Sequence, residues 1–366
     1  MANLEASQGQ RNKPVTLADV ARHAGVSAMT VSRVVNGEQA VKAATRERVL
    51  AAISKLKYIS SQAARRLVET GPIRIGVLYS NPSAGYLSEF LIGLINEASS
   101  SSVQLAVEWV DQHRGVASVD SFLAGGLDAV IVAPPLGDCG ALVDSVVERG
   151  LAAMLIAPGR PYAGVSSVGV DHYGAAVKMT QHLIALGHER IGFITGSATH
   201  SATECRLKGF RSAMRQARLA TPEDFVVPGL FTYSSGLVAA ETLLSRASRP
   251  TAVFASNDDM AAATVAVAHQ LGLDVPGDLT VVGCDDTPIA TSSRPELTTI
   301  RQPIRMMAAS SVSLLVRQVQ ARRDGHDFAP EVVHMGCEIV RRQSDAAPRK
   351  RASVVGLPRM GALSRG

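Results

Sequence analysis

Residues 16–37, TLADVARHAGVSAMTVSRVVNG, decide the fold of the first part of this 366-residue chain. Over 17–24 the apolar side chains recur at intervals of three and four residues, which predicts a short helix. Thr16 carries the kind of hydroxyl that caps a helix N-terminus, and Gly25 permits the left-handed conformation that ends a helix. The chain is therefore expected to begin with one short, capped helix followed by a tight turn.

The residues after this turn predict two more helices. Ser27 can cap a second helix, which Asn36-Gly37 ends. A third helix is expected over about 43–56, with an apolar face formed by Val49, Ala52, Ile53 and Leu56. Two helices joined by a tight turn at a glycine form a helix-turn-helix, so we predict a three-helix headpiece over 14–59.

One face of the second helix is suited to the major groove of DNA. Ala28, Met29, Ser32 and Arg33 share this face, opposite the valines of the helix. Arg33 can form two hydrogen bonds to guanine, and Ala28 and Met29 can contact thymine methyl groups. Short polar side chains suited to phosphates, which fix the register on DNA, are those of Ser27, Thr30, Ser32 and Asn36.

The run over 16–37 resembles, nearly position by position, the DNA-binding headpiece of the LacI/GalR family of bacterial transcription regulators. The resemblance implies that Ala28, Met29 and Arg33 read base edges. Thr16 and Leu17 are also expected to lie at the DNA.

The third helix departs from the family pattern at its start. Lys42 stands where the family often has a serine that caps this helix. A lysine side chain cannot accept an N–H bond, so either the cap is weaker or Thr45 supplies it. Lys42 and Thr45 are both expected near the DNA backbone.

Residues 60–71, SSQAARRLVETG, are expected to form a hinge helix after a flexible arm (1–13) and the headpiece. So short a helix is marginal alone in water and would fold when paired with a symmetry mate on DNA. The resemblance implies that Leu67 wedges into the minor groove at the operator centre, whereas an ordinary interdomain linker is the alternative. The family usually has Pro-Asn where this chain has Ser60-Ser61, which would loosen the entry to the hinge.

Charge is distributed unevenly along the chain. The net charge is +5, but residues 1–71 carry +6 (11 Lys and Arg against 5 Asp and Glu) and residues 341–366 carry +6 (7 against 1). The stretch 72–340 therefore carries −7 (19 against 26). A basic head and tail on an acidic body indicate that the ends meet a polyanion, and double-stranded DNA is the obvious candidate.

The body alternates short apolar runs with helical stretches, which predicts an α/β fold of doubly wound parallel sheets. Strands are expected over 73–80, 104–110, 128–134, 152–158, 190–196, 251–257 and 279–286. The body has about 270 residues, and its chain is expected to return once through a hinge-like segment from the second half to the first. This favours two lobes. Lobe 1 is expected to comprise about 72–169 and 302–328, and lobe 2 about 170–300 and 330–340.

Ligands in such sheets bind beyond the carboxyl ends of the strands. The polar and aromatic residues expected to bind an effector there, between the lobes, are Asn81, Tyr86, Asp171, Phe231, Asn257 and Asp285. Side chains of these kinds can hydrogen-bond sugar hydroxyls and stack on a sugar ring. Each also has a plainer interpretation, since an Asp at a strand end is often only a turn or helix cap.

The resemblance extends over about 14–340 and implies a periplasmic-binding-protein-like core. It implies that Arg206, in RLKGF, binds hydroxyls or a carboxylate and that Phe231 stacks on the ligand, with Asn257 and Asp285 contacting hydroxyls. SNPSAGYLSEF, APPL, IAPG and FTYSSG resemble a sub-group associated with aryl-β-glucosides. Ala157 departs from the pattern, because several sugar-binding members have an acidic residue there.

The remaining features exclude other classes of function. The sequence has no P-loop, no nucleophile elbow, no His-Glu-x-x-His and no cysteine cluster, so an enzyme, a metal site and a cofactor are not expected. Four dispersed cysteines and a polar N-terminus predict a reduced, cytoplasmic protein. The histidines, among them His172, His182, His188 and His200, are expected to be surface groups or satisfied ones.

Residues 341–366 are basic, rich in small residues and without heptads, so they are expected to be disordered and the assembly a homodimer. The prediction is a ligand-responsive repressor of carbohydrate uptake or catabolism genes, which binds a near-palindromic operator. A solute-capturing transport protein and a sugar-processing enzyme are the alternatives.

Overall fold

The computed structural model describes residues 16–35, 41–56, 71–111 and 119–349. The predictions for the arm at 1–13, for Asn36 and for Leu67 and the hinge around it lie outside these residues, as does the tail from residue 350. The chain divides into two compact units, Met1–Pro72 and Ile73–Gly366, and each is described by itself.

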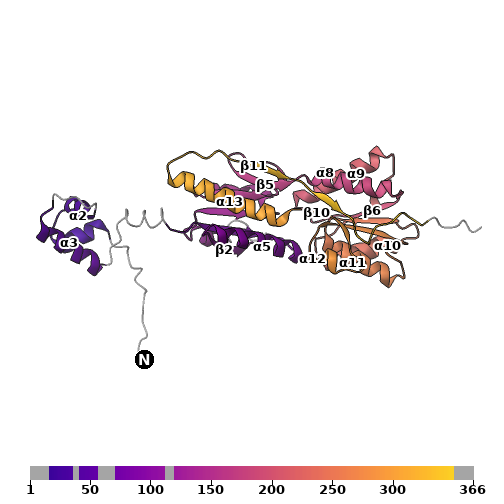
Figure 1. The fold of residues 1–366 in the computed structure, drawn as a ribbon, viewed down its shortest axis with the longest axis horizontal. Helices are drawn as coiled ribbons and strands as arrows, with labels where there is room; N and C mark the ends of the chain where they lie inside the picture. Colours follow the sequence, from indigo (N-terminus) through magenta and orange to yellow (C-terminus); the bar gives the residue numbers. More distant parts are fainter. Residues whose placement is uncertain (1–15, 36–40, 57–70, 112–118, 350–366) are drawn as a thin grey trace, which may run out of the picture. The chain divides into compact units, whose positions relative to one another are not determined.

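The first unit has the three predicted helices, α1 (Leu17–Ala24), α2 (Ala28–Val35) and α3 (Ala43–Leu56) (Figure 1). The Thr16 hydroxyl accepts the N–H of Asp19, and the Asp19 carboxylate accepts the N–H of Thr16 at 2.9 Å, which completes a capping box. Gly25 has φ of 64°, as predicted for the residue that ends α1. The buried side chains that join the helices are Val20, Ala21, Ala24, Val31, Val34, Val49 and Ala52.

The structure decides between the two alternatives given for the start of the third helix. The backbone carbonyl of Lys42 accepts the N–H groups of Thr45 and Arg46 at 2.9 and 3.0 Å, so α3 begins after Lys42. Thr45 is the third residue of the helix and cannot be its N-cap. The serine that is missing at 42 is not replaced by Thr45.

Lobe 1 of the second unit is a six-stranded parallel sheet in the order β11-β5-β4-β3-β1-β2. Its strands are β1 (Arg74–Tyr79), β2 (Gln104–Trp109), β3 (Ala129–Val132), β4 (Ala152–Ile156), β5 (Ser166–Val170) and β11 (Val332–Met335). Helices α5 (Ala84–Ser100) and α13 (Ile304–Arg323) pack on one face through Phe90, Leu94 and Met307 (Figure 1). The other face is covered by α6 (Asp120–Leu123), the short helix η2 (Leu136–Asp138) and α7 (Gly140–Glu148).

Lobe 2 is a second six-stranded sheet in the order β12-β10-β9-β8-β6-β7, parallel except for β12. Its strands are β6 (Ile191–Ile194), β7 (Val226–Val227), β8 (Ala252–Ala255), β9 (Thr280–Asp285), β10 (Thr298–Arg301) and β12 (Glu338–Val340). Helices α8 (His172–Ala185) and α9 (Ser201–Gln216) cover one face, and α10 (Tyr233–Leu244) and α11 (Asp258–Gln270) cover the other. Two short helices, η3 (Glu223–Phe225) and α12 (Pro288–Ser292), complete the lobe.

The two lobes are joined by three crossings of the chain, not by a single return. The crossings lie between β5 and α8, between β10 and α13, and between β11 and β12. Residues 332–335, predicted for lobe 2, therefore belong to lobe 1, because β11 pairs with β5. The two-lobed α/β architecture itself is as predicted.

Residues 341–349 form a strap on lobe 2, so disorder from residue 341 is wrong for this stretch. Ser344 is buried, and its hydroxyl accepts the N–H of Thr298 at 2.8 Å. The carboxylate of Asp345, also buried, lies 2.8 Å from Nε2 of His182. A composition typical of disorder is overcome here by hydrogen bonds to the end of the sheet.

Candidate functional site

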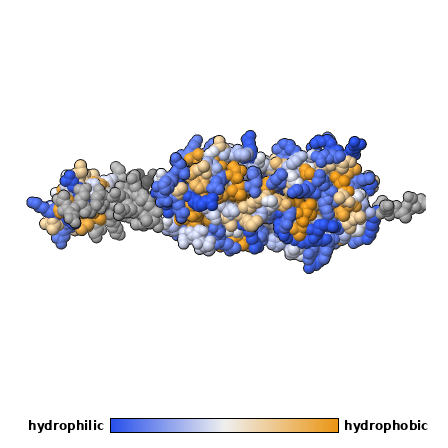
Figure 2. All heavy atoms as spheres, turned by 45° about the horizontal axis from the view of Figure 1, so that its top comes forward, coloured by the Kyte–Doolittle hydropathy of each residue, from blue (hydrophilic) through white to orange (hydrophobic). Residues whose placement is uncertain are grey.

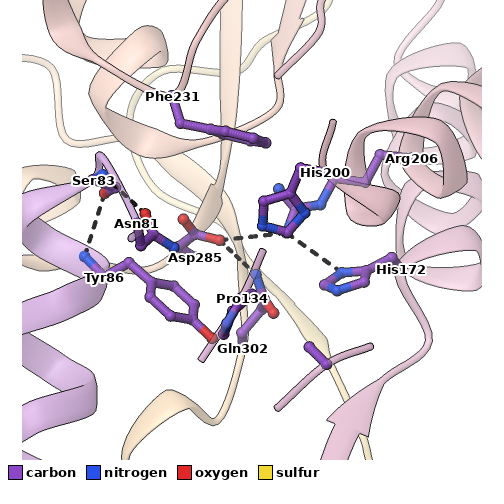
Figure 3. Close-up of a pocket in the computed structure, with 11 residues that line it drawn as sticks. Asn81, Ser83, Tyr86, Pro134, His172, His200, Arg206, Phe231, Asp285 and Gln302 are labelled. Carbon is purple, nitrogen blue, oxygen red and sulfur yellow. Dashed lines mark hydrogen bonds and ion pairs between the residues drawn. The ribbon is translucent and has the colours of Figure 1, made fainter. Parts of the chain in front are cut away.

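A cavity lies between the lobes, where the carboxyl ends of the strands of both sheets meet. Lobe 1 and lobe 2 each supply five of its lining residues, and Gln302 lies at the second crossing (Figure 3). The lining consists of Asn81, Ser83, Tyr86, Pro134, Ala157, His172, His200, Arg206, Phe231, Asp285 and Gln302. Five of the seven residues predicted to bind an effector are therefore brought together here.

An ion pair between Arg206 and Asp285 forms the floor of this cavity. The guanidinium Nη2 lies 3.7 Å from Oδ1 of Asp285, and each side chain is only 6% exposed. Burial raises the pKa of the Asp285 carboxyl to about 6, although the Arg206 charge opposes this shift. Gln302 donates from Nε2 to the same carboxylate, while its Oε1 has no partner among the described residues. The pair thus presents a fixed donor and a fixed acceptor to any ligand with hydroxyl groups.

Phe231 closes the opposite side of the cavity. Its φ is 61°, which side chains rarely adopt, and its carbonyl accepts Nδ2 of Asn257 at 3.0 Å. The ring lies against Gly196, where a Cβ would come within 1.8 Å of it. Only glycine at 196 leaves room for the ring in this position. Figure 3 shows the Phe231 ring extending over the cavity, above Asp285 and His200.

Two histidines predicted as surface or satisfied groups belong to the cavity wall, which corrects that prediction. Burial, together with the Arg206 charge, lowers the pKa of His200 to about 4 and that of His172 well below its usual value. Both rings are therefore neutral at pH 7, and His200 lies against Phe231 with ring centroids 5.3 Å apart. The prediction of satisfied histidines is confirmed for His182 and His188, whose ring nitrogens contact Asp345, Thr251 and Ala346.

Two predicted effector residues lie elsewhere. Asn257 is buried and caps α11, since its Oδ1 accepts the N–H of Met260 at 3.1 Å. Asp171 caps α8 by accepting the N–H of Gly174 at 2.8 Å. Neither lines this cavity, because each side chain serves a helix N-terminus.

Two further acidic side chains, Asp258 and Asp286, brace the cleft. Asp258 accepts from Thr287 and Thr299, and Asp286 pairs with Arg301 and Arg342.

Two polar contacts hold the lobes together on either side of the cavity. Ser83 of lobe 1 donates to Asp259 of lobe 2 at 2.7 Å. The Asp138 carboxylate of lobe 1 accepts the N–H of Gly159 at 2.9 Å and the N–H of Ser201, in lobe 2, at 3.0 Å. The cavity volume is only about 20 Å³, room for a water molecule, so a larger ligand enters only when the lobes part.

Sequence reasoning missed Ser83, Pro134, Ala157 and Gln302 as lining residues. A signal existed for Gln302, because it directly follows β10, as Asn81 follows β1. Pro134 and Ala157 also follow strands but carry no polar group.

In the headpiece, α2 presents the predicted DNA-reading face to solvent. Ala28, Met29 and Arg33 are exposed, Met29 to 65%, while Val31 and Val34 on the opposite side are buried. Ser27 caps the helix, because its hydroxyl accepts the N–H of Thr30 at 3.2 Å. An exposed arginine on such a helix lies outside the headpiece core, as a side chain that reads base edges must.

Fold and cleft together define a two-part regulator, in which a helix-turn-helix unit precedes a two-lobed ligand-binding core. Within the described residues no helix has the length and apolarity to span a membrane, and no group of three or more His, Cys, Asp or Glu is placed to hold a metal ion.

Comparisons with known proteins agree with this class. A model described as bacterial regulatory proteins, lacI family, matches residues 16–61, and one described as a periplasmic binding protein-like domain matches residues 180–344. Catabolite control protein A of Priestia megaterium is 32% identical over 83% of this chain and 92% of its own length.

Two solved structures have the same fold over nearly their whole length. A complex of the transcriptional regulator CelR with cellobiose gives a TM-score of 0.68 at 31% identity, over 90% of this chain and 99% of that one. A lac repressor dimer bound to operator and the anti-inducer ONPF also gives 0.68, at 28% identity, over 92% and 100%. The chain belongs to the lacI family of bacterial regulatory proteins and is a DNA-binding transcription regulator, not an enzyme.

Proposed function

We propose that the chain represses genes for carbohydrate uptake or catabolism and that a small sugar-like effector, bound between the lobes, controls its affinity for the operator. The buried Arg206–Asp285 pair facing Phe231 carries this proposal. A guanidinium and a carboxylate beside an aromatic face can hydrogen-bond sugar hydroxyls and stack on the ring. The CelR neighbour, which is in complex with cellobiose, supports the choice of ligand class.

The finer assignment is a β-glucoside, as expected from the resemblance to the aryl-β-glucoside sub-group. The neutral His172 and His200 beside the ion pair leave the cavity without excess charge, which favours an uncharged glycoside over a sugar phosphate.

The working unit is proposed to be a cytoplasmic homodimer that binds the two halves of a near-palindromic operator. Exposed apolar side chains occur on both lobes of the core, which supports the dimer. Trp109, 59% exposed, and Val107 lie on the edge strand β2, and Leu230 and Val238 lie at α10. Figure 2 shows apolar areas among hydrophilic ones on one face of the core. The lac repressor neighbour is a dimer on its operator.

The proposed DNA contacts are Thr16, Leu17, Ser27, Ala28, Met29, Thr30, Ser32, Arg33, Asn36, Lys42, Thr45 and Leu67, and the proposed effector contacts are Asn81, Tyr86, Arg206, Phe231 and Asp285. An effector that binds one degree of lobe closure better than another shifts the population of DNA-bound repressor. Coupling of this kind is typically about 1–3 kcal/mol, or roughly 5- to 150-fold in affinity.

The test is a thermal-shift screen of sugars and glycosides, followed by titration of the promoter DNA of the chain's own operon with and without each hit. Leu67→Ala is expected to weaken operator binding. Arg206→Ala is expected to bind operator normally but to lose the response to the effector. Arg206→Lys is the comparison variant, because it keeps a buried cation beside Asp285. If the wild-type chain binds its own promoter no better than random duplex, or no hit alters operator affinity, the proposal is wrong.

A further inference from the structure

A second cavity lies beside the first, and the contacts proposed above leave it unused. Its volume is about 250 Å³, and its walls are the loop 157–161, the ends of β5 and β11, and the starts of α8 and α9. Ala157 and His172 line both cavities and form the partition between them. A cavity of about 150 Å³ holds a benzene ring, so this one is large enough for a six-membered ring.

In this partition, His172 has a hydrogen-bond donor without an acceptor. Arg206, which can only donate, lies with Nη2 3.4 Å from Nδ1 of His172, so Nδ1 accepts. Burial lowers the pKa of His172 and keeps the ring neutral, so the single proton is on Nε2. That buried Nε2–H has no partner among the described residues. An unmet donor inside a protein is destabilising, and the atom is enclosed in the closed form, so a ligand oxygen reaches it and relieves this cost when the lobes part.

The second cavity has further features of a site for a neutral ring. The hydroxyl of Ser201 is also buried without a partner in the described part of the chain. The Tyr173 ring is held by a hydrogen bond from its hydroxyl to Ser212 at 2.9 Å. Val332 adds an apolar wall, and the opposite charges of Arg160 and Asp171 give no net preference for an ion. Aromatic and apolar surfaces with one or two hydrogen-bonding groups are typical of sugar and aryl sites.

We propose that the second cavity binds the second ring of a two-ring glycoside, whose first ring lies against Phe231 in the first cavity. Ala157, with no side chain beyond Cβ, leaves space between the two cavities. The oxygen that links the two rings, or a hydroxyl beside it, accepts the Nε2–H of His172. This assignment rests on the proposed function, because it extends the ligand of the same cleft.

The experiment measures, by calorimetry on the full chain, the affinity for methyl β-glucoside as the one-ring probe and for cellobiose and phenyl β-glucoside as two-ring probes. The wild-type chain is expected to bind a two-ring probe at least about tenfold more tightly than the one-ring probe. Val332→Trp fills the second cavity from an exposed position on an edge strand, so it is expected to abolish this preference and leave the one-ring affinity within about twofold. Val332→Ala is the matched control and should keep the preference.

Tyr173→Ala and Tyr173→Phe provide an independent pair. Removal of the ring is expected to reduce two-ring binding alone, whereas removal of only the hydroxyl is expected to keep most of it. If the preference survives both Val332→Trp and Tyr173→Ala, or if the wild-type chain binds one-ring and two-ring probes equally, the second-ring site is wrong while the first-ring site stands. If none of the probes binds, the β-glucoside assignment fails for both cavities.

Discussion

Closure of the lobes around the cleft requires glycine at position 159. A Cβ there would lie 2.2 Å from Cβ of Ser201 and 2.7 Å from its Oγ, on the opposite lobe. Carbon atoms in contact prefer about 3.5–4.0 Å, so Gly159→Ala must push the two lobes apart by more than about 1 Å at this point. Residue 159 lacks a positive φ, so the substitution causes no backbone strain of its own.

The cost can be worked from the contact that is broken. The Asp138 carboxylate accepts N–H groups from Gly159 and from Ser201, and separation of the lobes removes the bond to Ser201. A hydrogen bond to a charged group contributes about 1.5–3 kcal/mol, and solvent access places this one at or below the lower end. A loss of about 1–1.5 kcal/mol lowers the closed population relative to the open one by about 5- to 12-fold. Because the closed cavity has room only for a water molecule, the effector affinity rises by up to the same factor.

The assay compares effector affinity by calorimetry and chain dimensions by small-angle scattering. We expect Gly159→Ala to strengthen effector binding by up to the stated factor and to enlarge the scattering radius, with little change in the unfolding temperature. Gly140→Ala is the control, because nothing lies within 4 Å of a Cβ at that position. Unchanged effector affinity in Gly159→Ala would refute the role of this contact in closure.

The remaining predictions concern the headpiece and the ion pair. Arg33→Ala should weaken operator binding by about tenfold or more without changing effector affinity, because a bidentate guanine contact is worth about 1–3 kcal/mol; equal weakening on random DNA would contradict base reading. Thr16→Ala should remove about 1 kcal/mol of helix stability, seen as faster amide exchange over 17–24, while Ala18→Ser should not. Effector affinity should fall as the pH drops below about 6, because a sugar hydroxyl donates to the ionised Asp285 carboxylate, whose pKa burial raises to about 6. Asp285→Asn should bind weakly with no such pH dependence, and a flat wild-type profile over pH 5–8 would exclude Asp285 as the acceptor.

The same carboxyl sets a pH dependence of stability with a definite sign. A folded-state pKa above the usual 3.8 means that the folded chain binds this proton more tightly than the unfolded chain. Its contribution to stability is complete below about pH 4 and is lost as the pH rises toward 6. Asp285→Asn would remove this pH dependence.

Strand-end reasoning found Asp285 and the aromatic wall of the cavity because it depends on a general property of parallel sheets. Asp285 ends β9 and Phe231 follows β7, and the fold brings those ends together. Arg206 lies inside α9 and was expected only from the resemblance. The same rule failed for Asn257 and Asp171, since a side chain that caps a helix also follows a strand. The sequence does not distinguish a cap from a ligand contact.

The histidines were missed for a different reason. His172 enters the cleft only because the chain crosses between lobes at 170–172, and His200 only because α9 begins against the cavity. Such placement depends on tertiary structure and produces no characteristic spacing of residues in the sequence. Strands β5, β7 and β10–β12 were also missed, because all are short. In addition, β5 and β10 begin with pairs of Ser or Thr, and β11 and β12 have exposed positions.

The distribution of apolar contacts explains how a small ligand can govern so large a core. In the described residues each of the four large buried clusters of the core lies within one lobe, and only Cys337, at a crossing, packs against a cluster of each. The lobes are held across the cleft by polar contacts such as Ser83–Asp259 and Asp138–Ser201. Opening therefore exposes little apolar surface and costs a few hydrogen bonds that water can replace. Closed and open forms then differ by only a few kcal/mol, so a ligand whose contacts favour one of them by a similar amount decides which form reaches the DNA.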